Sequence, residues 1–250
     1  MKRVKTGIYG LDELIEGGFP AGRTVLVSGG CGTGKTIFSM QFAYRGAVEF
    51  DEPAVFVTLD ERPKMIREDM LRFGWDLKKA EQQGKFAILD ASAAKVGFPS
   101  DEKYTLPQSG IDIDKLLMKI MDISQQMGAK RVVIDSIAGL GLQAENVNEI
   151  RKTILKLNYL LLKTNYTTVI TSEIAEQSFE SGPMMFSKYG VEEYVADGLI
   201  VLHYLGIGTQ SNRQLYIRKM RGTKHFEDLI PMEITPKGIV VKKPEDEYKI

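Results

Sequence analysis

The chain has 250 residues, of which 43% are apolar and 26% are charged, and these values are ordinary for a globular protein. Such a composition excludes wholesale disorder, a collagen-like fibre and a disulfide-stapled scaffold. The 33 Lys and Arg residues balance the 33 Asp and Glu residues, so the chain as a whole carries no charge that would draw it to nucleic acid or to an anionic membrane.

Short apolar strands alternate with helical patterns over the first two thirds of the chain. The predicted strands are Arg23–Ser28, Ala54–Leu59, Phe86–Asp90, Arg131–Ile134 and Thr167–Thr171. The predicted helices are Thr36–Val48, Lys64–Phe73, Asp114–Met127 and Asn146–Lys163. Continuous apolar strands between helices are typical of a parallel sheet that is covered on both faces, so an α/β fold is expected.

The pattern changes after Gly198, where strand-like segments follow one another without helices between them. These segments are Leu199–Leu205, Gln214–Arg218, Pro231–Thr235 and Gly238–Val241. They predict antiparallel hairpins that extend the sheet. The Gly-, Pro- and Ser-rich stretch Lys95–Gly110 is expected to be a long loop. We predict a single domain over residues 1–243 and a charged tail, 244–250, that frays.

The single cysteine, Cys31, cannot form an internal disulfide, so a reducing, cytoplasmic setting is expected. The N-terminus lacks the apolar core of a signal peptide. No apolar run approaches the roughly 20 residues that a membrane-crossing helix needs. A membrane is therefore not among the expected partners.

The clearest functional signal is a glycine-rich segment between the first predicted strand and the first predicted helix. Residues 29–36 fit the pattern G-x-x-x-x-G-K-[ST] of a phosphate-binding loop. Its glycines let backbone N–H groups surround phosphate oxygens, and the helix N-terminus adds a positive dipole. Lys35 adds a full charge for the β- and γ-phosphates, and Thr36 offers a hydroxyl to Mg²⁺. The predicted nucleotide ligands are Gly29, Gly30, Cys31, Gly32, Thr33, Gly34, Lys35, Thr36 and Ile37.

Carboxylates follow two of the other predicted strands. Asp135 ends the apolar run Val132–Ile134 and is predicted to hold Mg²⁺, as a Walker B aspartate does, although a turn-initiating aspartate has the same pattern. Asp60 and Glu61 end the strand Ala54–Leu59, where they would orient and deprotonate an attacking water. A solvated turn pair is the alternative. Spacing does not decide which of the two acids is the base.

A basic stretch lies near the C-terminus, where no acid occurs from Gly198 to Phe226. On an extended strand, Lys219 and Arg221 point to the same side. Two adjacent cations could clamp a γ-phosphate as an arginine finger does. A strand edge protected by cations from edge-to-edge pairing has the same pattern, and spacing leaves both interpretations open.

Taken together, these residues resemble a KaiC-type domain of the RecA-like ATPase superfamily. The matching segments are Thr6–Leu14, Gly17–Pro20, Ser28–Thr36, Phe56–Pro63, Phe73–Asp76, Ile134–Gly139, Tyr189–Tyr194 and Lys219–His225. They occur in the family's order and span the chain from Thr6 to Val241. The resemblance implies a RecA-like P-loop NTPase with a mostly parallel central sheet, flanking helices and C-terminal antiparallel strands.

The resemblance also implies a ring-shaped homo-hexamer that hydrolyses ATP between subunits with Mg²⁺. In such a ring Asp60 and Glu61 activate water, Lys35 binds the phosphates, and Lys219 and Arg221 reach the γ-phosphate of the neighbouring subunit. Further residues implied to contact the nucleotide are Met220, Thr223 and His225 from the neighbour, and Arg72 and Thr235 near the adenosine end.

Two departures from the clock-type members of this family restrict the function. The chain has one phosphate loop where some members carry two tandem domains. Glu193 and Tyr194 occupy the places of the Ser/Thr pair that clock-type members autophosphorylate. Autokinase activity at that site and a circadian role are therefore not supported.

The favoured function is a slow, ring-forming ATPase that acts as a regulatory switch on an unidentified protein partner. A DNA-dependent recombinase or helicase motor shares the same core, but the loop Ile137–Ile150 has acids and no Lys or Arg, and Glu173–Glu193 has five acids against Lys188. Phosphate binding needs cations, so nucleic acid is not an expected partner. A nucleotide-gated scaffold with negligible turnover is the third possibility, against which the Asp60–Glu61 pair counts. The residues do not distinguish ATP from GTP.

Overall fold

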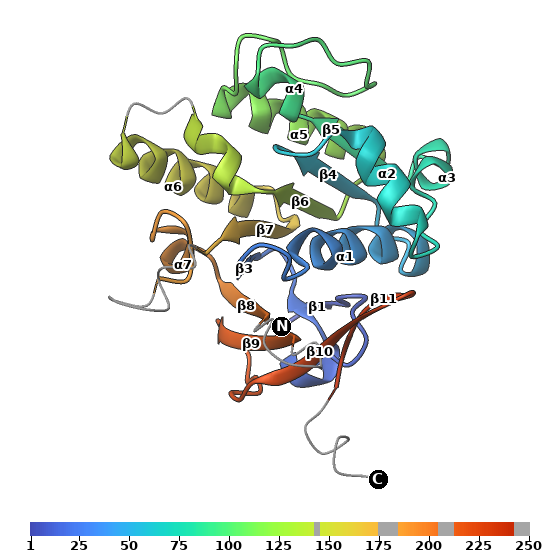
Figure 1. Cartoon of the computed structure of the whole chain (residues 1–250), viewed down its shortest axis with the longest axis vertical. Coiled ribbons are helices and arrows are strands. Elements are labelled where there is room, and N and C mark those ends of the chain that lie inside the picture. The colour runs from blue at the N-terminus through green and yellow to red at the C-terminus, as the bar shows by residue number, and fades with distance from the viewer. Residues whose placement is uncertain (143–145, 175–184, 205–212, 243–250) are drawn as a thin grey trace.

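The computed structural model describes residues 1–142, 146–174, 185–204 and 213–242. Within these ranges nine strands form one sheet in the order β11-β10-β9-β8-β3-β7-β6-β4-β5 (Figure 1). Its parallel strands are β3 (Thr24–Gly29), β4 (Ala54–Thr58), β5 (Phe86–Asp90), β6 (Arg131–Asp135), β7 (Thr167–Glu173) and β8 (Gly198–Tyr204). The predicted parallel sheet is confirmed.

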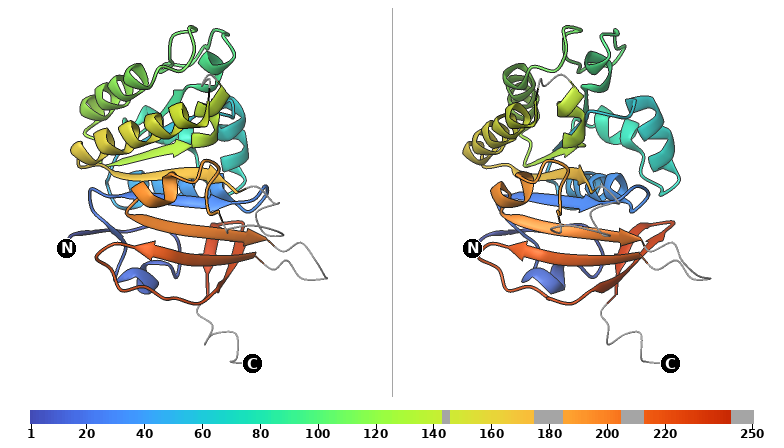
Figure 2. Two further views of the ribbon diagram at one scale, coloured as in Figure 1. Left: turned by 90° about the vertical axis from the view of Figure 1, so that its left-hand side faces the viewer. Right: turned by 60° about the vertical axis from the view of Figure 1, so that its left-hand side comes forward.

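Helices cover both faces of this sheet (Figure 2). One face is covered by α1 (Lys35–Glu49), α2 (Pro63–Leu71) and α3 (Leu77–Gln82). The other is covered by α4 (Ser92–Lys95), α5 (Ile113–Met127) and α6 (Val147–Lys163), with the short α7 (Glu192–Val195) beside α6. Two 3-10 turns, η1 (Asp12–Ile15) and η2 (Ile137–Leu142), complete the helical elements of the described ranges.

The alternation of side chains along each buried strand explains why the strands read as continuous apolar runs. On β3, Val25 and Val27 pack toward α1, whereas Leu26 packs toward α6. Because both faces of the strand meet helices, every position must be apolar or small. The apolar stripe of α6 faces the same core, since Ile150 and Ile154 are buried against the sheet.

The C-terminal strands differ in one respect from their prediction. β8 pairs parallel to β3, with Gly198 opposite Val25, and so belongs to the parallel part of the sheet. β9 (Arg213–Met220), β10 (Ile230–Thr235) and β11 (Gly238–Val241) then pair antiparallel, as expected. The chain passes through α7 before β8, and a crossover of that kind permits parallel pairing, whereas a tight hairpin does not. Leu205, the predicted end of β8, lies outside the described residues.

Several short elements had no clear sequence signal. They are α3, α4 and a two-stranded sheet of β1 (Arg3–Val4) and β2 (Phe19–Pro20). The predicted loop Lys95–Gly110 begins with the last residue of α4, and Thr105 forms one bridge with Asp90. The predicted tail, 244–250, lies outside the described residues. None of the helices in the described parts of the chain is both long and apolar enough to span a membrane.

Candidate nucleotide site

The predicted phosphate loop joins β3 to α1 at the carboxyl edge of the parallel strands. Gly32 and Gly34 have φ values of +70° and +101°, which side chains with a Cβ rarely adopt. A Cβ at Gly30 or Gly32 would meet no atom within 4 Å, so open space faces the loop. The hydroxyl of Thr33 donates to the carbonyl of Gly30 at 3.0 Å and closes the turn. The loop therefore has the form of a cradle with free space in front of Gly30 and Gly32.

Lys35 is the first residue of α1, and its ammonium lies over this cradle. Nζ donates to the carbonyl oxygens of Gly29 at 3.0 Å and Gly30 at 2.8 Å. Burial lowers the pKa of Lys35, while the carboxylates of Glu173 and Asp135 act in the opposite direction. A cation that is partly desolvated beside an open cradle suits an anionic ligand such as a polyphosphate.

Thr36 and Asp135 meet beside the loop. Asp135 ends β6, is 8% exposed, and accepts a hydrogen bond from the Thr171 hydroxyl of β7. Burial raises the pKa of Asp135, and side-chain hydrogen bonds from Thr171 and Thr36 oppose that shift. A hydroxyl and a carboxylate are the hard oxygen donors that Mg²⁺ takes, together with water and substrate phosphates. In the described ranges there is no cluster of three His, Cys, Asp or Glu side chains.

Asp60 and Glu61 follow β4, which lies next to β6 in the sheet. The carboxylate of Asp60 is engaged at both oxygens. Its Oδ1 lies 2.5 Å from the ammonium of Lys95, and its Oδ2 accepts from the hydroxyl of Ser136 at 2.9 Å. Asp60 is therefore held between α4 and the residue that follows Asp135.

Glu61 is in a different situation. Its main chain is held by Thr58, whose hydroxyl donates to the Glu61 carbonyl at 2.7 Å, but no described side chain donates a hydrogen bond to its carboxylate. Burial raises the pKa of Glu61, and the neighbouring negative charges of Asp135, Asp69 and Asp60 raise it further. Sequence spacing did not distinguish Asp60 from Glu61, but the two carboxylates differ in their hydrogen-bond partners.

Lys219 and Arg221 lie near the amino ends of the parallel strands, whereas the phosphate loop of the same chain lies at their carboxyl ends. Lys219 pairs opposite Leu199, whereas Gly29 is level with Leu202. Strand geometry separates the two positions by about 10 Å along the strands and about 10 Å across them. The other end of β9 does reach the loop, because Nη2 of Arg213 lies 3.4 Å from the carbonyl of Gly32.

Both cations contact main-chain carbonyls of α7, and Lys219 also contacts the residue that follows this helix. Nζ of Lys219 donates to the carbonyls of Ala196 at 2.7 Å, Glu193 at 3.2 Å and Tyr194 at 3.5 Å, which uses all three of its donors. Nη2 of Arg221 donates to the Tyr194 carbonyl at 3.3 Å, and the side chain of Arg221 remains 55% exposed. The structure therefore brings the two cations together, with Lys219 bound within its own chain and Arg221 facing solvent.

The other residues of this turn have partners within the chain. Met220 is 4% exposed and belongs to the hydrophobic core, so its side chain does not face solvent. The hydroxyl of Thr223 accepts from Nη1 of Arg3 at 2.5 Å. The ring Nδ1 of His225 lies 3.1 Å from the carbonyl of Phe226.

The two residues predicted near the adenosine end come from segments far apart in the chain. Arg72 is exposed at the C-terminus of α2, and the hydroxyl of Thr235, at the end of β10, donates to the carbonyl of Gly238 at 2.8 Å. The residue before Thr235 lies against the phosphate loop, since a Cβ on Gly34 would lie 3.1 Å from Cδ1 of Ile234. Thr235 is thus near the loop of its own chain.

Four residues of this region escaped sequence reasoning. Lys95 and Ser136 contact Asp60, Thr171 donates to Asp135, and Asp197 accepts from Arg221. The sequence analysis gave none of them a role, although Ser136 lies in the matching segment Ile134–Gly139. Each becomes visible only when strands and helices distant in sequence are placed side by side.

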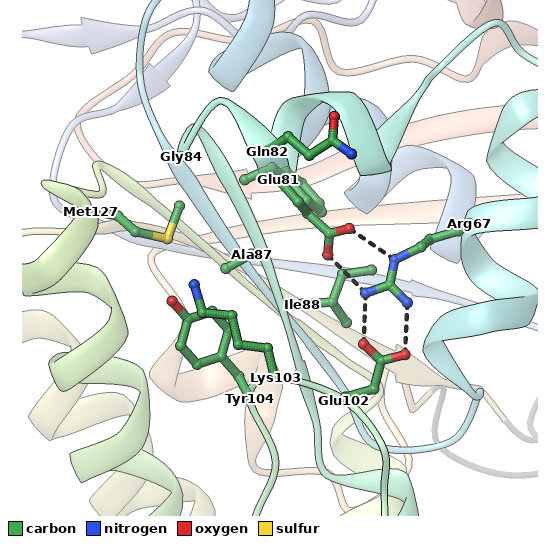
Figure 3. A pocket seen from close by; sticks show the side chains of 11 residues that line it. Arg67, Glu81, Gln82, Gly84, Ala87, Ile88, Glu102, Lys103, Tyr104 and Met127 are labelled. Carbon is green, nitrogen blue, oxygen red and sulfur yellow. Dashed lines mark hydrogen bonds and ion pairs between the residues drawn. The ribbon is translucent and has the colours of Figure 1, made fainter.

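A separate cavity of about 290 Å³ lies at the outer edge of the sheet, beside β5 (Figure 3). Arg67 closes one side of it through ion pairs to Glu81 at 2.8 Å and Glu102 at 2.7 Å. β5 is four strands from β3, so about 19 Å separates this cavity from the phosphate loop. It is not part of the nucleotide site.

The chain resembles proteins of one family over nearly its whole length. Residues 4–246 match the family model for the KaiC ATPase. The chain is 42% identical to a UPF0273 protein of Methanocaldococcus jannaschii over 245 residues, which cover 96% of each protein. It is 41% identical to the circadian clock oscillator protein KaiC of Synechococcus elongatus over 95% of this chain but only 43% of the clock protein, so it spans less than half of that relative.

A solved structure agrees with this match. The crystal structure of a KaiC-like protein from the hyperthermophilic archaeon Pyrococcus horikoshii superimposes with a TM-score of 0.81 at 44% sequence identity. The similarity covers 97% of this chain and 99% of that one.

Proposed function

Because the chain belongs to the KaiC ATPase family, we propose that it binds ATP with Mg²⁺ and hydrolyses the ATP slowly at the subunit interfaces of a homo-oligomeric ring, with six subunits as the expected number. Residues 1–243 would form one ATPase unit that serves as a regulatory switch for a protein partner in the cytoplasm. The observation that supports hydrolysis at subunit interfaces is the position of Arg221. It is exposed and lies far from its own phosphate loop, which supports a contact with the loop of another subunit.

In this proposal the backbone of Gly29–Gly34 and Lys35 hold the phosphates, while Thr36 and Asp135 hold Mg²⁺. When bound, Mg²⁺ neutralises charge on the β- and γ-phosphate oxygens. Cys31 and Ile37 border the same loop. Arg72 and Thr235 contact the adenosine end, and the neighbouring subunit contributes Lys219, Met220, Arg221, Thr223 and His225. Met220 would contribute main-chain atoms, because its side chain is buried.

We assign the role of general base to Glu61 and an orienting role to Asp60. A base must have a free carboxylate oxygen within reach of the water whose proton it accepts. Both oxygens of Asp60 are occupied by Lys95 and Ser136, whereas no described side chain donates to the carboxylate of Glu61. Glu61 would take the proton as water attacks the γ-phosphorus and the bond from that phosphorus to the bridging oxygen breaks, which releases ADP and phosphate. Arg221 of the neighbouring subunit would balance the charge that develops on the transferred phosphoryl group.

The experiment that tests this function is steady-state MgATP hydrolysis over protein concentrations that span assembly, with and without single-stranded DNA. Lys35→Ala provides the background rate. GTP in place of ATP tests whether the site prefers adenine or guanine nucleotides. Slow turnover that rises with assembly and ignores DNA supports the proposal. Strong stimulation by DNA would instead favour a recombinase or helicase motor, and ATP binding without turnover would favour a nucleotide-gated scaffold.

A further inference from the structure

A buried carboxylate lies beneath the exposed arginine. Asp197, between α7 and β8, has a side chain that is only 2% exposed. Its Oδ1 lies 3.0 Å from Nη1 of Arg23 and 3.5 Å from Nη1 of Arg221. The main chains are joined as well, because the N–H of Arg221 donates to the carbonyl of Asp197 at 2.8 Å and the N–H of Asp197 donates to the carbonyl of Thr24 at 2.8 Å. Asp197 therefore connects the turn after β9 to the central strand β3.

This arrangement fixes the arginine while keeping its positive charge. A carboxylate is costly to bury unless cations and hydrogen bonds compensate it. Here one carboxylate is shared by Arg23 and Arg221, with Lys219 beside them, so the cluster remains positive overall. The side chains of Arg23 and Arg221 are 43% and 55% exposed, which places the anion inside and the cations toward solvent.

We propose that Asp197 is a positioning residue for ATP hydrolysis, holding the guanidinium of Arg221 in place before the neighbouring subunit docks against it. An arginine side chain has several rotatable bonds, and ordering it in advance removes an entropy cost from the assembled site. Small errors in the position of a charged group reduce catalysis strongly. In this role Asp197 acts through Arg221, and the inference rests on the proposed function.

The first test is Asp197→Asn, which keeps the shape of the side chain and removes its charge. We expect kcat to fall at least about tenfold, while binding of ATP and assembly stay unchanged, because the nucleotide loop is intact. Arg23→Gln is the matched control, since it removes the other partner of Asp197 and leaves Arg221 in place. Adding Asp197→Asn to Arg221→Ala should cost nothing further, because the two residues act as one unit. An unchanged kcat in Asp197→Asn would overturn the proposal.

The second test separates positioning from damage to the fold. Asp197→Asn subunits are mixed with Lys35→Ala subunits, each preparation having low activity alone. In mixed rings roughly a quarter of the interfaces would join an intact loop from the first to an intact arginine from the second, and activity should return at those interfaces. If Asp197→Asn acted by damaging its own nucleotide loop, mixing would restore nothing, and the proposal would be wrong.

A second mixture shows whether an inactive Asp197→Asn mixture refutes only the role of Asp197 or also the proposed function. Arg221→Ala subunits mixed with Lys35→Ala subunits should regain activity if the arginine acts between subunits. If that mixture stays inactive, the interface mechanism itself fails. If it recovers while the Asp197→Asn mixture does not, only the role of Asp197 is refuted. Should Asp197→Asn not fold, the double variant with Arg23→Gln removes the arginine left without its partner and is mixed in the same way.

Discussion

The ammonium of Lys95, at the end of α4, lies 2.5 Å from Oδ1 of Asp60. The Lys95 side chain is 16% exposed, so this ion pair is partly shielded from solvent. It attaches the first acid of the Asp60–Glu61 pair to a helix that no sequence signal placed beside it. The pair thereby becomes asymmetric, and the two acids should respond differently to mutation.

Glu61→Gln is expected to abolish most hydrolysis while ATP still binds. General base catalysis contributes at least about 100-fold to the rate, so kcat should fall by that factor or more. Asp60→Asn keeps one oxygen that can accept from Lys95 and places an amide NH2, which can donate to the Ser136 hydroxyl, where the second oxygen stood. It should cost about tenfold, as expected for a residue that orients the site. The measurement is kcat with the Kd for ATP in each variant. A larger loss in Asp60→Asn than in Glu61→Gln would reverse the assignment.

The rate should depend on pH through Glu61. Burial and the negative charges of Asp135, Asp69 and Asp60 raise the pKa of Glu61, and the base must be ionised to accept a proton. The rate of hydrolysis should therefore rise with pH, and the midpoint of this ascending limb should lie above the usual pKa range of glutamate. Asp69→Asn removes one of those charges, lowers the pKa of Glu61 and shifts the limb to lower pH in a profile of kcat/KM. Glu68→Gln on the same helix is the control and should leave the limb in place.

Arg221→Ala should lose about a thousandfold in kcat, as removal of an arginine finger does, with part of the ATP affinity retained. Lys219→Ala should also lower the melting temperature, because Lys219 satisfies three carbonyls of its own chain. Arg218 lies on the same strand over the ring of Phe186, and Arg218→Ala is the matched control for charge. A turnover in Arg221→Ala equal to that of the unmodified protein would rule out the interface arginine.

The fold itself depends on a buried arginine at the start of β6. Arg131 is fully buried, and its Nε and Nη2 donate to Oε2 of Glu52 at 2.9 and 2.6 Å. Glu52→Ala leaves this charge without its carboxylate and should reduce the free energy of unfolding by about 3 kcal/mol. Glu233 pairs with Lys242 at the surface, and Glu233→Ala should cost less than about 1 kcal/mol. Denaturant unfolding of both variants checks the difference, and equal costs would contradict it.

Local sequence patterns accounted for the fold class and for much of the site. The apolar runs of β3, β4 and β6 and the glycines of the phosphate loop have short-range signatures, because strand periodicity and turn conformation depend on neighbouring residues. The family membership and the mostly parallel sheet that they predicted are confirmed. The roles of Lys35, Asp135 and the other site residues stay predictions that the variants above test.

The sequence by itself determined which residues could do the chemistry: the phosphate loop, the carboxylates that end strands, and the paired cations near the C-terminus. Only the tertiary structure decided which of these residues lie together and which lie apart. It placed Arg221 far from its own phosphate loop, joined Asp60 to Lys95, and put Asp197 beneath Arg221. The physical reason is that these relations depend on strand order and register between segments far apart in the chain, and no local periodicity encodes them.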